Sequence, residues 1–92
     1  MAWYLELTYS FDDIDFIFKT DKLIEKTLGQ ERDSSGTLFT DNTRSLSFVF
    51  DTREDAEAAA EKVKQLFKEH NIQGDIYAIY QYEGEDEDED ED

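Results

Sequence analysis

The sequence contains no cysteine and a single histidine among its 92 residues. Without cysteine, neither a disulfide framework nor a thiolate metal site can form, so packing and hydrogen bonds must hold the fold together. The absence fits a reducing compartment, and we expect a cytoplasmic protein. The first residues lack the regions of a signal peptide, and no run approaches the roughly 18 apolar residues that span a bilayer, so we expect no membrane association.

Sequence patterns for catalysis and for bound cofactors are also missing. The four glycines are isolated, and none has the spacing of a phosphate-binding loop. No segment has the ligand spacing of an EF-hand loop. His70 follows an apolar helical stripe, where a histidine commonly caps the last carbonyls of a helix. The sequence therefore favours a protein that is not an enzyme and that binds neither a metal nor a cofactor.

Basic residues are scarce, with 9 against 25 acidic ones, which gives a net charge of −16. Nine of the acids lie in residues 83–92, which leaves 16 acids against 9 bases, or −7, in residues 1–82. Such a charge repels nucleic acid and anionic lipid and attracts cationic surfaces. We expect a protein partner with a basic surface and no direct binding to nucleic acid.

The chain nevertheless has enough large apolar side chains to fold, including seven Phe, five Tyr and one Trp. Its length allows one domain, which we place at residues 1–82. Residues 83–92 are of low complexity, and their eight consecutive acids repel one another, so a disordered acidic tail is expected there.

The first half of the domain reads as a strand followed by a helix. Apolar residues alternate over residues 3–11, as in a half-buried strand. Ser10 and Asp13 have the spacing of a capping pair, and apolar residues then recur at helical intervals up to Gly29, which predicts a helix over 13–28. Residues 14–19 could instead form a short strand hairpinned to the first.

The second half repeats this order. Residues 37–40 and 45–51 read as strands joined by a turn, and Thr52 and Asp55 repeat the capping spacing before a helical stripe that ends near Asn71. Residues 76–82 form the last strand. The resulting βαββαβ order predicts an α+β, ferredoxin-like split βαβ fold, with a four-stranded antiparallel sheet of order 4-1-3-2 and two helices on one face.

The candidate binding residues are acids in two regions of the chain. In the tail, extended residues advance about 3.3 Å each, close to the per-strand phosphate spacing of B-DNA, so a row of carboxylates can imitate a phosphate backbone. A second cluster opens the first helix, and we expect it to share an edge of the domain with Asp51, Glu54 and Asp55 at the start of the second helix. The candidates are Glu85, Asp86, Glu87, Asp88, Glu89, Asp90, Glu91, Asp92, Asp12, Asp13 and Asp15.

Two alternatives compete with this interpretation. The tail could only increase solubility or prevent edge-to-edge strand pairing, and acids in a first helical turn stabilise the helix dipole. The open sheet face must carry Tyr77 or Tyr80, and it could dock a protein or form a homodimer. Stacking of RNA bases is disfavoured because the strands offer no run of basic residues.

The layout resembles the ribonuclease E activity regulator B family, acidic proteins with a ferredoxin-like body and an acidic tail that inhibit an RNA-degrading enzyme. The resemblance rests on residues 9–13 at the first crossover, on the helix over 56–71 that leads into a tyrosine-containing strand, and on the tail. In size and charge the chain is also similar to small phage-encoded DNA mimics. Both resemblances imply inhibition of a nucleic-acid-handling protein. Together with the charge, they favour a nucleic-acid mimic that inhibits, for example, a nuclease or a defence enzyme.

Overall fold

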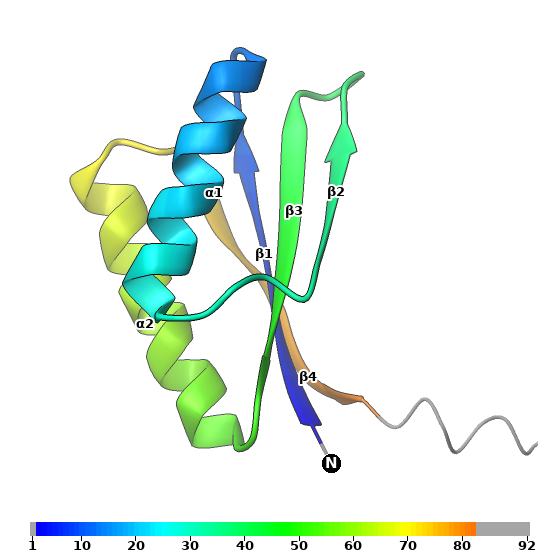
Figure 1. Cartoon of the computed structure of the whole chain (residues 1–92), viewed down its shortest axis with the longest axis vertical. Helices are drawn as coiled ribbons and strands as arrows, with labels where there is room; N and C mark the ends of the chain where they lie inside the picture. The colour runs from blue at the N-terminus through cyan, green and yellow to red at the C-terminus, as the bar shows by residue number, and fades with distance from the viewer. Residues whose placement is uncertain (1, 83–92) are drawn as a thin grey trace, which may run out of the picture.

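The computed structural model describes residues 2–82, which form four strands and two helices. In chain order these are β1 (Ala2–Ser10), α1 (Ile14–Leu28), β2 (Ser34–Leu38), β3 (Thr43–Phe50), α2 (Arg53–Glu69) and β4 (Gly74–Tyr82). All pairings are antiparallel, in the order β2-β3-β1-β4, and both helices cover one face of the sheet (Figure 1). The ferredoxin-like α+β fold predicted from the sequence is confirmed.

The core lies between the sheet and the two helices. Leu5, Leu7 and Tyr9 of β1 are at most 1% exposed, and Leu46 and Phe48 of β3 lie beside them, as the alternating patterns predict. The buried stripe of α2 consists of Ala56, Ala59, Ala60, Val63, Leu66 and Phe67. Removing these apolar side chains from water is the main source of stability for the domain.

Helix α1 resolves the alternative that the sequence left open, because residues 14–19 are helical. Its N-cap is Asp13, whose extended backbone (φ −153°, ψ 173°) lets the side chain accept a hydrogen bond from the Phe16 N–H at 2.9 Å. Ser10, expected to cap the helix, instead ends β1. A carboxylate is well suited to this position, since it accepts the N–H and also balances the helix dipole. Gly29 ends the helix as predicted, with φ 74°.

Helix α2 begins and ends close to the predicted positions. Thr52 is the N-cap and accepts a hydrogen bond from the Asp55 N–H at 3.1 Å. At the other end, the His70 N–H donates to the Leu66 carbonyl at 3.0 Å, and Asn71 follows with φ 56°. The capping spacing therefore located this helix correctly.

Strand β2 starts at Ser34, three residues before the predicted Thr37. Its serines have low strand propensity, but they pair with β3, and the hydroxyls of Ser34 and Ser47 lie 2.6 Å apart. Pairing with an existing strand therefore outweighs local propensity. The hairpin turn ends at Asn42, which has φ 54°, before β3 begins.

Strand β4 contains a β-bulge that interrupts the alternation of its side chains. Glu6 pairs with Ala78, whereas Leu7 pairs with Ile76, so Tyr77 is the extra residue between the two pairs. Tyr77 is consequently 71% exposed. Period-two alternation alone therefore could not assign every residue of β4 to a face.

Candidate protein-binding surfaces

Three of the acids selected from the sequence lie together where α1 begins. Asp12 precedes the helix, Asp13 caps it, and Asp15 is in its first turn, and all three are exposed. Within residues 2–82, none of them forms an ion pair. Asp13 has a structural role as the cap, while the carboxylates of Asp12 and Asp15 are accessible to a cationic partner.

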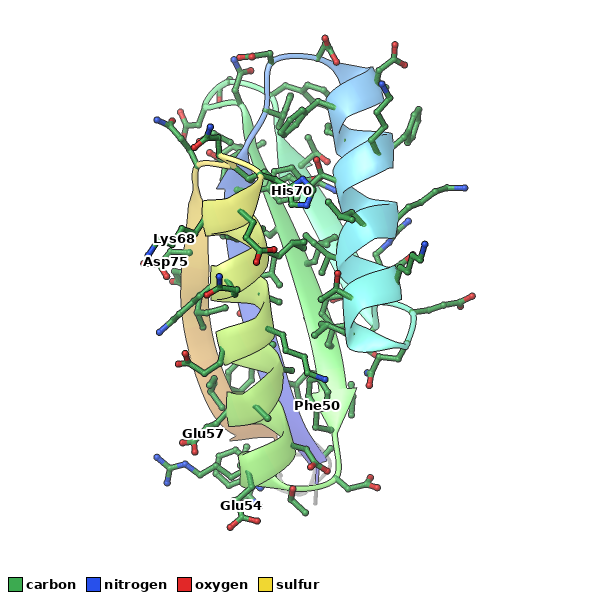
Figure 2. The ribbon with its side chains drawn as sticks, turned by 90° about the vertical axis from the view of Figure 1, so that its left-hand side faces the viewer. Phe50, Glu54, Glu57, Lys68, His70 and Asp75 are labelled. Carbon is green, nitrogen blue, oxygen red and sulfur yellow. The ribbon has the colours of Figure 1, made fainter. Side chains whose placement is uncertain are left out.

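The expectation that the two acidic clusters share an edge is wrong. Because β1 and β3 are antiparallel, the helices that follow them begin at opposite ends of the sheet (Figure 1). Figure 2 shows Glu54 and Glu57 at the end where α2 starts, far from the first turn of α1. Strand β1 runs between the two ends and spans roughly 26 Å at about 3.3 Å per residue. The two clusters are therefore separate surfaces.

The remaining candidates, residues 85–92, lie outside the residues that the structure describes. They follow β4, whose last residue, Tyr82, pairs with Ala2 at the start of β1. This is the end of the sheet at which α2 begins. Asp51 and Glu54 are therefore closer to the point where the tail leaves the domain than the three aspartates of α1 are.

An exposed apolar surface, which the sequence interpretation missed, lies at the end where α1 begins. Ile14 and Phe18 on α1 are 45% and 60% exposed, and Phe39 at the tip of the β2–β3 hairpin is 62% exposed. Buried Phe11 connects these elements: its ring meets that of Phe39 edge-on, with centroids 5.9 Å apart, and its N–H donates to the Asn42 carbonyl at 3.1 Å. We call Ile14, Phe18 and Phe39 the α1–hairpin surface.

The helical spacing shows which way this side of α1 faces. Ile14, Phe18, Asp21 and Glu25 are three or four residues apart, so they form one stripe along the helix. In that stripe, Asp21 binds Arg44 of β3. Ile14 and Phe18 therefore lie on the side of α1 that is turned toward the β2–β3 hairpin, which carries Phe39.

A buried ionic network, also missed in the sequence, attaches α1 to the sheet. The Asp21 carboxylate is 3% exposed and accepts hydrogen bonds from the Tyr9 hydroxyl at 2.6 Å and from Arg44 Nε at 3.2 Å. Arg44 Nη1 also donates to Thr37 Oγ1 at 2.6 Å, and Arg32 Nη1 lies 3.3 Å from Asp21. Since Tyr9, Arg44 and Thr37 are neighbours across three adjacent strands, the carboxylate links the helix to β1 and β3 directly and to β2 through Arg44.

The ionisation of this network is fixed by its surroundings. Burial and the hydrogen bond to Asp21 raise the pKa of Tyr9, so its hydroxyl remains a donor. Burial lowers the pKa of Arg44, but hydrogen bonding and charge attraction with Asp21 outweigh this, and the pKa is raised overall. A tyrosine kept neutral and an arginine kept charged indicate a structural role for the network.

The open face of the sheet carries a pair of stacked tyrosines. Tyr80 pairs with Tyr4 across the strands, and their rings stack with centroids 5.6 Å apart at 11°. Tyr80, 40% exposed, is thus the tyrosine of the last strand that the prediction required on this face. Beside the pair, a hollow of about 240 Å³ is lined by Glu6, Ser34, Ser35, Gly36, Ser45, Leu46 and Ser47. Its lining is hydroxyl-rich and contains no base.

His70 lies at the end of α2, and Figure 2 shows it turned toward α1. It lines a hollow of about 180 Å³ together with Phe16, Lys19, Thr20, Leu23 and Ile72. Across residues 2–82, no three His, Cys, Asp or Glu side chains are placed to hold a metal ion. In the same residues, no helix is both long and apolar enough to cross a membrane.

Comparisons with known proteins found no matching family model, no matching curated protein and no matching solved structure. The resemblances to the ribonuclease E activity regulator B family and to phage-encoded DNA mimics therefore stay predictions.

Proposed function

We propose that this protein is a non-enzymatic binding protein that occupies a basic, nucleic-acid-binding surface of another protein and thereby inhibits it. The observation that carries the proposal is the net charge of −16, combined with its distribution. A field of this size attracts cationic surfaces and accelerates association with them.

The distribution of the bases supports this proposal. Arg32, Arg44, Arg53 and Lys64 form ion pairs with carboxylates of the domain. The other five bases are lysines of the two helices. By contrast, residues 11–18 and 38–43, which lie at the end where α1 begins, contain four aspartates and no base. These two segments are thus acidic, although Lys19 follows the first of them and the end of α2, with Lys68 and His70, lies at the same end of the sheet.

The sequence of the tail is the reason for proposing a partner that binds nucleic acid. Residues 85–92 are eight consecutive acids. A chain of this kind can place carboxylates at intervals close to those of backbone phosphates, so lysine and arginine side chains arranged for nucleic acid can bind it.

The proposal is tested by passing an extract of the source organism over the immobilised protein, at about 50 and 300 mM salt, and identifying the proteins that are retained. The full chain and a chain ending at residue 84 are compared. We expect the full chain to retain a basic protein at low salt and to release it at high salt, and the truncated chain to retain less. Retention that does not depend on salt would contradict the proposal.

A second candidate function is favoured by the exposure of Tyr77 and by the stacked pair of Tyr4 and Tyr80. In this case the open sheet face or the β4 edge docks a partner or a second copy of the chain, and the tail only increases solubility. Tyr77→Ala or Tyr80→Ala would then weaken binding more than loss of the tail does, and binding would tolerate salt. Sedimentation at several protein concentrations would detect the dimer.

A further inference from the structure

We infer that the α1–hairpin surface, with the aspartates around it, docks a protein segment that carries apolar side chains flanked by lysine or arginine. The inference rests on the proposed function, and it adds the place on the domain and the chemistry of the segment that binds there.

The apolar part of the site consists mainly of two exposed phenylalanines. An aromatic side chain buries roughly 150–250 Å² when it is fully covered, so Phe18 and Phe39, each about 60% exposed, together offer on the order of 200–300 Å². Single exposed apolar residues are common, whereas several on one side of a domain, as the stripe of α1 and the hairpin tip provide, are a candidate interaction site. Phe11, which is 6% exposed, already fills the core beneath Phe39. Phe18 and Phe39 are therefore available to a partner.

The acidic part determines what kind of partner fits. Asp12, Asp13 and Asp15 lie within two residues of Ile14, Asp41 lies two residues after Phe39, and the one base next to these residues in the chain is Lys19, which follows Phe18. An apolar centre with a charged rim is the usual anatomy of a protein interface. Because four aspartates outnumber one lysine, the rim is acidic on balance and attracts lysine and arginine. It also repels anionic lipid, so the exposed phenylalanines favour a basic protein segment over a membrane surface.

The apolar area of the α1–hairpin surface is suited to the centre of a larger protein interface. A stable protein interface covers about 800 Å² on each partner, of which a few buried aromatic anchors supply most of the binding energy. The α1–hairpin surface supplies such anchors, and the four aspartates extend the contact to its rim.

The test uses two synthetic 14-residue peptides with the full chain. In one, leucine and lysine are arranged as an amphipathic helix, and in the other every leucine is replaced by serine at the same charge. Binding is measured by calorimetry at about 150 mM salt, and the contacted residues are located by NMR of the labelled protein. We expect the leucine–lysine peptide to bind more tightly and to shift the amide signals of residues 11–18 and 38–43.

Substitutions identify the anchors. Phe18→Gln and Phe39→Gln should each weaken binding of the leucine–lysine peptide at least about tenfold. Gln65→Ala is the control, because Gln65 is exposed on α2 and outside the α1–hairpin surface, and it should leave binding unchanged. Melting temperatures of the three variants are compared with that of the natural chain, to confirm that each is folded.

Three results would overturn the inference: equal binding of both peptides, unchanged affinity in the phenylalanine variants, or amide shifts elsewhere on the domain. In each case salt-dependent binding would still support the proposed function, with charge alone as its basis. If neither peptide binds even at about 50 mM salt, both the inference and the proposed function fail.

Discussion

Replacing Asp21 by alanine would leave the Arg44 guanidinium buried without its counter-charge. The two side chains are only 5% and 12% exposed, so neither can turn into water to recover its hydration. The Tyr9 hydroxyl would lose its closer acceptor in the same step and keep only the Ile17 carbonyl, 3.3 Å away. The consequences are a weaker link between α1 and the sheet and an unpaired charge in the core.

The expected loss in the free energy of unfolding can be estimated from the burial of the Asp21–Arg44 pair. Removing one partner of a buried ion pair costs about 3–5 kcal/mol. A domain of this size has a free energy of unfolding of roughly 4–12 kcal/mol, so the variant would lose a large fraction of its stability. The exposed pair between Arg53 and Glu57, with side chains 66% and 51% exposed, provides the control. Glu57→Ala should cost no more than about 1 kcal/mol.

Urea unfolding at pH 7, followed by circular dichroism and by the fluorescence of Trp3, measures these differences. Asp21→Asn separates charge from shape, because the amide keeps an oxygen for the Tyr9 hydroxyl but cannot neutralise Arg44. We expect both Asp21 variants to be much less stable than Glu57→Ala. If Asp21→Ala loses less than about 1 kcal/mol, the network does not hold α1 on the sheet.

Three further predictions concern stability. Because the pKa of Tyr9 is raised above its unfolded value of about 10, the folded state binds this proton more tightly, and the free energy of unfolding should fall above pH 10 by up to about 1.4 kcal/mol per pH unit. Urea titrations at pH 9 and pH 11 should show a smaller fall in the free energy of unfolding for Tyr9→Phe than for the natural chain. An identical fall in both would refute the role given to Tyr9. Asp13→Ala should cost about 1 kcal/mol and Ser10→Ala less than about 0.5 kcal/mol in the same assay, whereas the reverse order would make Ser10 the cap. Gly74→Ala should cost about 1–3 kcal/mol because its methyl group would lie 2.6 Å from a backbone oxygen. Gly36→Ala, whose methyl group would meet nothing within 4 Å, should be nearly neutral. Equal effects of the two substitutions would contradict this packing.

Most of the fold could be predicted because its local signals agree with one another. The alternation over residues 3–11 and the helical stripe that follows Thr52 both have the periods of their elements, and two right-handed crossovers then determine the sheet order. The bulge at Tyr77 could not be predicted, since an inserted residue leaves the composition of a strand unchanged. The cap at Asp13 was missed because Ser10 has the same spacing motif, and only the length of β1 excludes it.

The binding surfaces were less predictable, because they depend on residues that are distant in the chain. Asp21 lies 12 residues from Tyr9 and 23 from Arg44, and only the register of the strands brings them together. Phe18 and Phe39 were missed for a related reason: composition suggests that phenylalanines belong to the core, and only the packed structure shows these two exposed. The acidic clusters were identified but placed wrongly, although the predicted antiparallel pairing of the first and third strands already implies that the two helices begin at opposite ends of the sheet.

The central claim, that the protein occupies a nucleic-acid-binding surface, is tested most directly by competition. A partner captured at low salt on the immobilised full chain is challenged with increasing concentrations of duplex DNA or of RNA, at constant ionic strength. We predict that nucleic acid releases the partner, at concentrations set by the partner's own affinity for it. A partner that stays bound to this chain while also binding nucleic acid would contradict the account.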